Sequence, residues 1–256
     1  MQLHRHFVEK PWGRTDIPAA FGAPAGARIG EIWYEHANGP ALPLLVKWLF
    51  TSEKLSIQVH PSDADARSAG LPSGKEECWY IVDAAPGAVI GLGTIRPLDS
   101  AELRAASVSG EIEALMDWRP VAAGDFFYIP AGTIHAIGAG ITLVEVQQNA
   151  DITYRLYDYR RLDKGVPRVL HLDKAVTAAR AEPYRDERSG HAVSNAQLVD
   201  GPRFSLWFLH DGDDLPIHDT DRQQWIVPLS GPEMGTCFLR KSGEDMKVSV
   251  PHLLVA

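Results

Sequence analysis

The sequence predicts a mainly β protein, an antiparallel sandwich or barrel with a few helices and a smaller second β module. Two observations support this fold class. From Leu42 to Tyr159 the chain divides into short strand-like segments, and the turns between them are rich in Gly, Pro and Asp. Short strands with such turns are typical of β-sandwiches and barrels. The segments read LLVKWLF, KLSIQVH, ECWYIV, AVIGLG, DFFYIP, TIHAI, ITLVEVQQ and ITYRLYD.

Residues 1–40 are predicted to be rich in loops, because Gly and Pro recur in segments such as FGAPAGARIGE. Within this region only GEIWYEH has the composition of a strand.

Helices are predicted at two interruptions of the β pattern and once beyond it. PSDADARSAG offers Ser62 as an N-cap, with Asp residues in the first turn. A helical insertion is predicted near residues 99–118, capped by Asp99 or Ser100 and divided at Gly110. HLDKAVTAARA predicts a further helix.

The chain of 256 residues is long enough for a sizeable core, in one large domain or in a main domain with a smaller companion. We predict a metal-binding domain over residues 1–165. Residues 166–256 are expected to hold the last helix and a smaller β module without a site of its own, because RFSLWFLH and QWIVPLSG resume the strand pattern without further ligand residues.

Charge and composition exclude several functions. A formal net charge of -8 argues against a general nucleic-acid or anionic-membrane surface. The longest apolar runs are interrupted by Pro and Lys and are too short to span a bilayer. The N-terminus has no apolar segment typical of a secretory signal. Cys78 and Cys237 form no CxxC pair, and we expect a reduced cytoplasmic protein.

An unusual strand carries Gln58 and His60 two residues apart in LSIQVHP. Because side chains alternate along a strand, these two point the same way, while Leu55, Ile57 and Val59 fill the opposite face. The polar face therefore meets either solvent or a ligand that binds an amide oxygen and an imidazole.

Glu77, which opens the predicted strand ECWYIV, and His135, which follows a Pro-Ala-Gly turn, complete a potential ligand set with Gln58 and His60. Two imidazoles, a carboxylate and an amide oxygen can surround a divalent cation and leave positions open for water or substrate. One carboxylate leaves such a site with about one net positive charge, enough to polarise a carbonyl or hold an enediolate. Taken singly, each His is more often a structural residue, and two His with one carboxylate also serve iron oxygenases.

Four motifs then resemble, in order and spacing, the type I mannose-6-phosphate isomerases of the cupin superfamily, in particular their short bacterial branch. The resemblance covers roughly Lys10 to Ala175 and is weak in the C-terminal part. The motifs are LSIQVHP, GKEECWYI, GDFFYIPAGTIHAI and EVQQNADITYRLYDYRRLD.

This resemblance implies a cupin fold, a double-stranded β-helix or jelly-roll-like barrel, and a zinc-dependent aldose–ketose isomerase. Its substrates would be mannose 6-phosphate and fructose 6-phosphate, interconverted through an enediol-type intermediate. The family's ligands fall on Gln58, His60, Glu77 and His135, with one Zn²⁺ per chain. The ligand set alone also admits iron, cobalt or manganese.

Cations for the substrate's phosphate are concentrated in TYRLYDYRR, since Arg can bind phosphate oxygens with a fixed fork of donors. By the resemblance, Arg155 takes the place of the family's active-site arginine, and Ser56 and Lys75 lie near the substrate. Arg161 stands where some members place a phosphate-binding lysine, and Arg160 is an equally plausible phosphate contact.

Proton transfer between adjacent carbons requires a base, and the candidates are Lys75, Glu145 and Asp151. The two carboxylates match residues that line the family's pocket, although each is also a candidate structural partner of Arg155. Some distant members carry a tyrosine where this chain has Ile137, which removes a phenolic proton carrier at that point.

Two other classes of function remain open at this stage. One is another cupin enzyme, either a different sugar-phosphate isomerase or an iron-dependent oxygenase. The other is a module that binds a sugar phosphate without turnover. Fold alone does not separate these, because barrels of this type host many chemistries.

Overall fold

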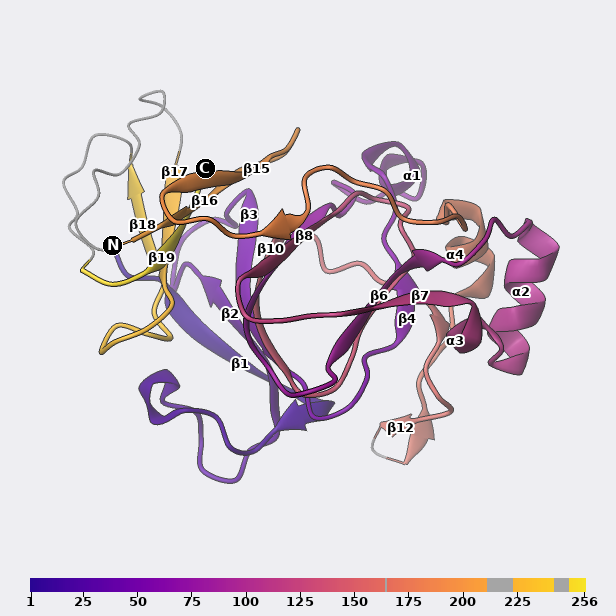
Figure 1. Ribbon diagram of the computed structural model, residues 1–256, viewed down its shortest axis with the longest axis horizontal. Coiled ribbons are helices and arrows are strands. Elements are labelled where there is room, and N and C mark those ends of the chain that lie inside the picture. Colours follow the sequence, from indigo (N-terminus) through magenta and orange to yellow (C-terminus); the bar gives the residue numbers. More distant parts are fainter. Residues whose placement is uncertain (164, 211–222, 242–248) are drawn as a thin grey trace.

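Three β-sheets form the body of the protein. Its α-helices lie at the end of the molecule away from the C-terminal strands, beside the smaller of the two sheets that form the barrel (Figure 1). The computed structural model describes residues 1–163, 165–210, 223–241 and 249–256. The mainly β fold class is confirmed. Part of the predicted second module, residues 211–222 and 242–248, lies outside the described residues.

A seven-stranded sheet and a five-stranded sheet enclose the barrel, with apolar residues such as Trp79, Ile90, Ile137 and Leu143 packed between them. The larger sheet runs in the order β1 (His4–Arg14), β2 (Ile29–Glu35), β3 (Leu44–Phe50), β10 (Ile141–Gln148), β5 (Glu77–Ala84), β8 (Asp125–Ile129) and β14 (Gly190–His191). The smaller sheet runs in the order β11 (Tyr154–Tyr157), β4 (Ile57–Val59), β9 (His135–Ile137), β6 (Val89–Thr94) and β7 (Met116–Pro120).

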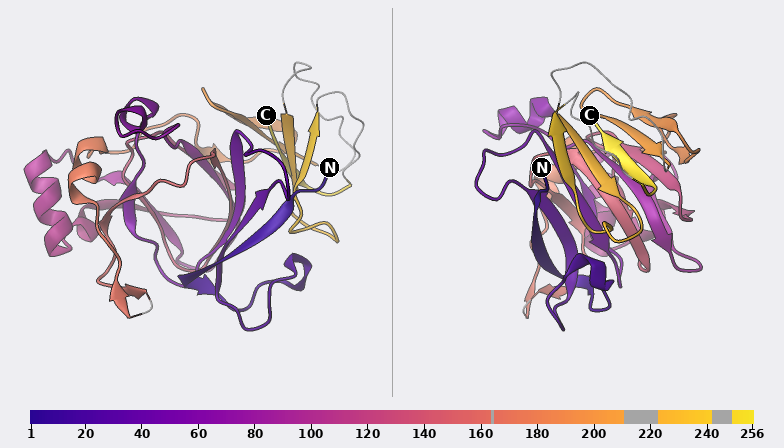
Figure 2. Two further views of the ribbon diagram at one scale, coloured as in Figure 1. Left: turned by 180° about the vertical axis from the view of Figure 1, so that it is seen from behind. Right: turned by 90° about the vertical axis from the view of Figure 1, so that its left-hand side faces the viewer.

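The C-terminal strands form the third sheet, in the order β15 (Ala196–Asp200), β16 (Ser205–Leu209), β19 (His252–Val255), β17 (Gln223–Pro228) and β18 (Phe238–Lys241). Figure 2 shows this sheet at one end of the molecule, opposite the helices. Strands β12 (Leu162–Asp163) and β13 (Val166–Pro167) form a separate small hairpin. The division into domains at residue 165 stays a prediction.

The helices begin and end where the sequence predicts them, with one exception. Ser62 caps α1 (Asp63–Ser68), and Asp99 caps α2 (Ser100–Ser109), which ends at Gly110 with a φ of 92°. Beyond them lie α3 (Ile112–Leu115), α4 (Leu172–Ala178) and a 3₁₀ turn, η1 (Ala19–Phe21). None of the helices in the described ranges is long and apolar enough to cross a membrane.

Residues 116–118, predicted as the end of the helical insertion, instead begin β7. Met116 and Trp118 pair with β6, where a neighbouring strand supplies backbone partners that a short helix lacks. The helical spacing of apolar residues continues across this junction, because Leu115 ends the helix and Met116 begins the strand, and it therefore gives no signal of the change.

The prediction of a loop-rich N-terminus was wrong for β1, a strand of 11 residues that pairs with β2. Its sequence, HRHFVEKPWGR, contains a Pro and a Gly and alternates poorly. Irregular register after Val8 and Glu9 accommodates these residues, as bulges do on edge strands.

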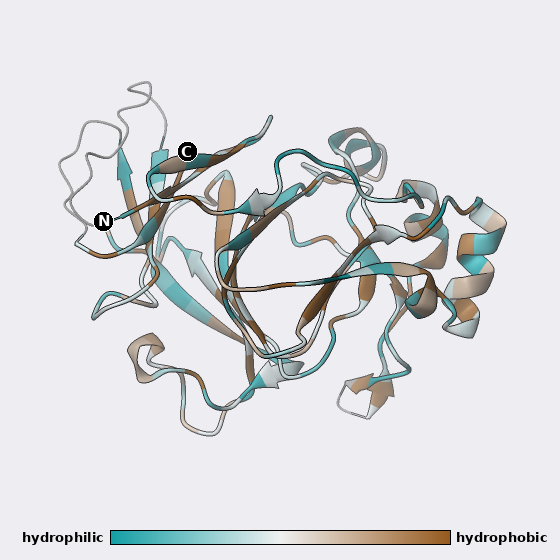
Figure 3. Cartoon of the chain, viewed as in Figure 1, coloured by the Kyte–Doolittle hydropathy of each residue, from teal (hydrophilic) through white to brown (hydrophobic). Residues whose placement is uncertain are grey.

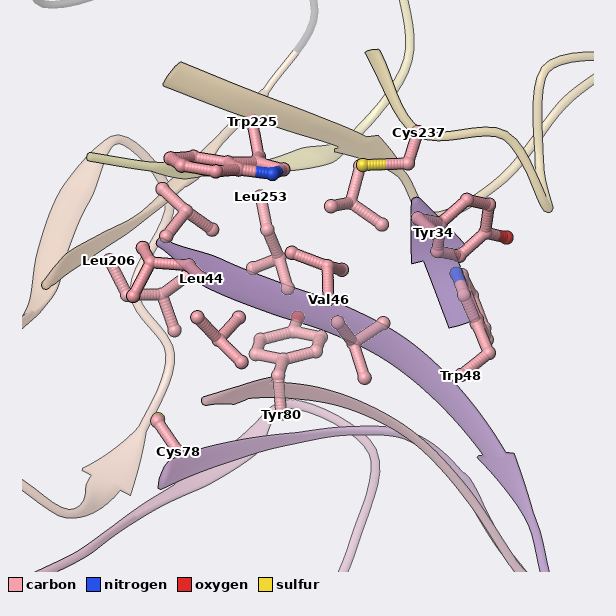
Figure 4. Close-up of a cluster of buried hydrophobic side chains, with 14 of the residues drawn as sticks. Tyr34, Leu44, Val46, Trp48, Cys78, Tyr80, Leu206, Trp225, Cys237 and Leu253 are labelled. Atoms are coloured by element: carbon pink, nitrogen blue, oxygen red, sulfur yellow. The ribbon is translucent and has the colours of Figure 1, made fainter. Parts of the chain in front are cut away.

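An apolar layer joins the C-terminal sheet to the outer face of the seven-stranded sheet. Figure 4 shows Trp225 and Leu253 packed over Leu44 and Val46 of β3. All four side chains are at most 6% exposed. The apolar segments of β3 and β10 are visible at the centre of the cartoon in Figure 3.

Candidate metal centre

Strand β4 shows the alternation that the sequence predicted. Ile57 and Val59 are fully buried in an apolar cluster with α2, whereas Ser56 and Gln58 interact with each other, hydroxyl to amide oxygen, at 3.0 Å. The amide nitrogen of Gln58 lies 3.3 Å from Nε2 of His135 on the adjacent β9. A half-turn of the amide exchanges its oxygen and nitrogen, so Gln58 can present its oxygen to the same place.

His60, Glu77 and His135 converge inside the barrel, each at most 1% exposed. The two carboxylate oxygens of Glu77 lie 3.3 Å from Nε2 of His60 and 3.5 Å from Nε2 of His135. One ligand atom from each of the three residues falls within 4.8 Å of the others.

Backbone carbonyls orient both imidazoles. Nδ1 of His60 lies 2.7 Å from the carbonyl oxygen of Ile152, and Nδ1 of His135 lies 2.8 Å from that of Thr133. Each Nδ1 therefore donates its proton outward, which leaves the Nε2 lone pair directed at Glu77. This is the tautomer that a metal ligand requires.

Ligand atoms of His60 and Glu77 lack hydrogen-bond partners. Nε2 of His60 and both carboxylate oxygens of Glu77 are buried without a hydrogen bond, although buried polar atoms are nearly always paired. The ammonium of Lys75 forms an ion pair with Oε2 of Glu77 at 2.8 Å. A divalent cation coordinated by these atoms would satisfy them, and two imidazoles with a carboxylate suit zinc or iron. The residues fit a metal.

A line of buried residues with alternating positive and negative charge extends from the cluster along the inner face of the seven-stranded sheet. Beyond Lys75, Oε1 of Glu145 lies 3.7 Å from the Lys75 ammonium and 3.1 Å from that of Lys47. Lys47 in turn lies 3.9 Å from Glu31, which pairs with Lys10 at 3.2 Å. The four residues Lys75, Glu145, Lys47 and Glu31 are at most 9% exposed.

Two indoles hold the carboxylates of this line in place. Trp79 donates Nε1–H to Glu145 at 3.2 Å, and Trp33 donates to Glu31 at 2.6 Å. Lys47 and Glu31 were not predicted as site residues. The signal for Lys47 was a single cation within the apolar strand LLVKWLF, which requires a buried counter-charge.

Charge and burial set the protonation states. Burial lowers the pKa of His60 to about 3 and also lowers the pKa of His135, so both imidazoles are neutral at pH 7. Burial would lower the pKa of Lys75 as well, but the carboxylates of Glu145 and Glu77 more than offset it and raise that pKa. Burial would raise the pKa of Glu77, but the positive charge of Lys75 opposes this and the pKa is lowered.

Arg155 extends from β11 opposite Gln58, and residues paired across antiparallel strands share a face. Its Nε is buried without a partner, and no ion pair to its guanidinium is found among the described residues. Burial and the nearby Arg168 lower its pKa. Neither Glu145 nor Asp151 forms an ion pair with Arg155 in this part of the chain, and Asp151 is exposed.

The other two arginines differ from Arg155. Arg161 is 11% exposed and is already engaged, by the carbonyl of Lys54 at 2.5 Å and by Glu53 at 3.5 Å. Arg160 is exposed and has a positive φ of 55°. That Arg160 and Arg161 contact the phosphate stays a prediction. Ile137 packs in the barrel core, and Cys78 in the apolar layer on the opposite face of β5.

No family model matches the chain. Among curated proteins, it is 41% identical over 223 residues to the mannose-6-phosphate isomerase of Streptococcus mutans, which covers 82% of this chain and 70% of that protein. It is 42% identical over 188 residues to mannose-6-phosphate isomerase ManA of Bacillus subtilis, where the match covers 70% of this chain and 58% of that protein.

Solved structures give the same result along the whole chain. The crystal structure of the Bacillus subtilis mannose 6-phosphate isomerase superimposes with a TM-score of 0.83 and 30% identity, covering 99% of this chain and 98% of that one. A zinc-bound mannose 6-phosphate isomerase superimposes with a TM-score of 0.69 at 14% identity, a likeness of fold.

Proposed function

The chain belongs to the mannose-6-phosphate isomerase family, and from this premise we propose that it interconverts mannose 6-phosphate and fructose 6-phosphate in a metal-dependent reaction. The observation that carries the proposal is the buried cluster of His60, Glu77 and His135, in which Nε2 of His60 and both carboxylate oxygens of Glu77 lack hydrogen-bond partners. Beside it lies Arg155, for which no ion pair is found among the described residues.

His60, Glu77 and His135 would hold one zinc ion per chain, with Gln58 as the fourth ligand. When bound, zinc supplies a Lewis acid for the oxygen atoms on the two carbons that exchange oxidation state. Zinc is bound in one of the mannose 6-phosphate isomerases that share this fold, and iron, cobalt or manganese fit the same donor types.

Arg155 is the residue proposed to orient the substrate. Its guanidinium is partly buried and has no carboxylate partner among the described residues, so an anionic substrate can occupy its donors. Ser56 lies next to Gln58 at the same face, and Arg160 and Arg161 are the further candidates for phosphate. In a chain with a net charge of -8, these local cations would have to bind the anion.

The proton-transfer group is proposed among Lys75, Glu145 and Asp151. Isomerisation moves a proton between C1 and C2 through an enediol-type intermediate, and the base must accept and return it. Lys75 and Glu145 are buried within the line of ion pairs, which restrains them beside the metal ligands. Asp151 is exposed and close enough for its charge to act on Arg155.

We place the protein in the cytoplasm, on the ground that Cys78 and Cys237 are both free and buried.

The test is isomerisation of mannose 6-phosphate by the purified chain, as isolated, after chelation, and after adding back zinc, iron, cobalt or manganese singly. We expect activity to be lost on chelation and restored by zinc. Folded, metal-loaded protein without turnover would overturn the assignment. Oxygen consumption with iron would favour the oxygenase that shares this ligand set, and binding of the sugar phosphate without turnover would favour a binding module.

A further inference from the structure

Three consecutive backbone N–H groups next to the metal cluster are held by three different acceptors. The amide of Gly74 donates to Oδ1 of Asp63 at 2.8 Å, and the amide of Lys75 donates to the carbonyl of Pro61 at 3.1 Å. The amide of Glu76 donates to the side-chain oxygen of Gln148 at 3.0 Å. The backbone on both sides of Lys75 is therefore fixed just before Glu77.

Asp63 is the centre of this arrangement. Besides Gly74, its Oδ1 accepts a hydrogen bond from the side-chain nitrogen of Gln148 at 3.1 Å. Its other oxygen, Oδ2, forms an ion pair with Arg203. The Gln148 amide thus links Asp63, at the start of the loop, to Glu76, at its end.

Close packing confirms that the two ends of the loop meet. A Cβ atom added to Gly74 would lie 2.4–2.6 Å from backbone atoms of Pro61, Ser62 and Asp63, so only glycine fits this approach. The closed loop runs from His60 to Glu77, and both are members of the metal cluster.

Arg203 comes from the turn between β15 and β16, in the C-terminal sheet. That sheet contacts the barrel mainly through the apolar layer, and its described residues contribute no member of the metal cluster. The pair with Asp63 connects this sheet to the loop that carries two of the proposed ligands.

We propose that Asp63, Gln148 and Arg203 form a clamp that positions Lys75 and Glu77, and that the C-terminal sheet supports catalysis through it. These are positioning residues, since they reach the site only through the loop. The inference rests on the proposed function for its effect on turnover. Its effect on metal retention is independent of turnover.

The test uses the full-length zinc-loaded chain with Arg203→Met, Asp63→Asn and both together. Asp63→Asn keeps an acceptor for Gly74 and removes the charge that pairs with Arg203. The matched control is Arg104→Met, which breaks an exposed ion pair with Asp173 between α2 and α4. Kinetics give kcat and KM separately, transfer of zinc to a chromogenic chelator gives the rate of metal loss, and thermal melting reports folding.

We expect Arg203→Met to lower kcat about 3-fold and Asp63→Asn about 10-fold with KM within about twofold, because small displacements of a catalytic group are costly. Both variants should lose zinc faster than the control. The double variant should be no worse than Asp63→Asn alone, because Arg203 acts through Asp63. Arg203→Lys should recover part of the loss.

Values of kcat and zinc loss equal to those of Arg104→Met would overturn the clamp, as would multiplicative effects in the double variant. If Asp63→Asn does not fold, Arg203→Met against Arg203→Lys decides the question. If the wild-type chain does not isomerise the sugar phosphate, the proposed function fails, and the rate of zinc loss still tests the clamp.

Discussion

The two faces of the sheet formed by β3, β10 and β5 differ in what they bury, because both carry apolar residues and the inner face adds buried ion pairs. On the outer face, Val46 of β3 and Val144 of β10 pack in the apolar layer with Leu253. On the inner face, the next residue of each strand, Lys47 and Glu145, forms a buried ion pair at 3.1 Å. A register shift of one residue would exchange the faces, so the apolar layer fixes the register that brings the charges together.

The two faces also differ in what they contribute to stability. Apolar burial stabilises the fold by about 25 cal/mol per Å² of apolar surface. Burying charges costs several kcal/mol per ion, which ion pairs and hydrogen bonds only partly offset. We infer that the apolar outer face contributes stability and that the buried charges of the inner face contribute the chemistry, and four substitutions test this division.

The largest effect is expected for Glu77→Gln, which removes the single carboxylate of the cluster and keeps its shape. Loss of residues that merely orient ligands costs 10- to 100-fold, so loss of the ligand itself should lower kcat/KM at least about 1,000-fold. The variant should fold, because no apolar contact changes. Zinc content per chain, isomerase activity and circular dichroism measure this.

Glu76→Gln is the matched control for that prediction. The carboxylate of Glu76 accepts a hydrogen bond from the Tyr128 hydroxyl and lies outside the metal cluster. This variant should keep its zinc. Loss of zinc from both variants to the same extent would contradict the selection of Glu77 over its neighbour.

On the outer face, Leu253→Ala should lower the free energy of unfolding by about 2–5 kcal/mol, because Leu253 is fully buried in the apolar layer. Zinc content at low temperature should not change. Denaturant titration measures the loss, and Val193→Ala, at a side chain that is 68% exposed, should change stability by less than about 0.5 kcal/mol. A loss of zinc without a loss of stability would reverse the roles of the two faces.

On the inner face, Lys47→Met should lower the free energy of unfolding by about 2 kcal/mol, because Glu31 and Glu145 lose a partner and keep others. Adding Glu31→Gln removes one of the two charges that have lost a partner and should restore part of the stability. The second substitution should not raise isomerase activity above that of Lys47→Met alone. Denaturant titration and steady-state kinetics separate the two effects, and an additive loss of stability would show that Lys47 and Glu31 are not coupled.

The contrast between local alternation and pairing of distant strands explains which parts of the site the sequence predicts. Alternation along LSIQVHP placed Gln58 and His60 on the face that the structure brings beside His135. The line of ion pairs was not predicted, because Lys47 and Glu145 are 98 residues apart in the chain and meet only when β3 and β10 pair. Pairing between distant strands has no local signal. Strand β1 was missed for a different reason, because its sequence contains a Pro and a Gly and alternates poorly.

The smallest effect is expected for Arg155→Lys, which keeps the charge and loses the fork of donors. If Arg155 binds an anionic substrate, KM should rise about 10-fold, or about 1.4 kcal/mol, while zinc content stays the same. Steady-state kinetics with mannose 6-phosphate and zinc analysis measure this.

Arg161→Lys provides the contrast, because this guanidinium is already bound by the carbonyl of Lys54 and lies near Glu53. It should change KM less than Arg155→Lys and should instead reduce thermal stability slightly. The reverse order would mean that Arg161 leaves its partners to bind phosphate, and that the absence of an ion pair at Arg155 in the described part of the chain has another cause. The comparison therefore tests whether a partly buried cation without an ion pair among the described residues marks the place of the substrate.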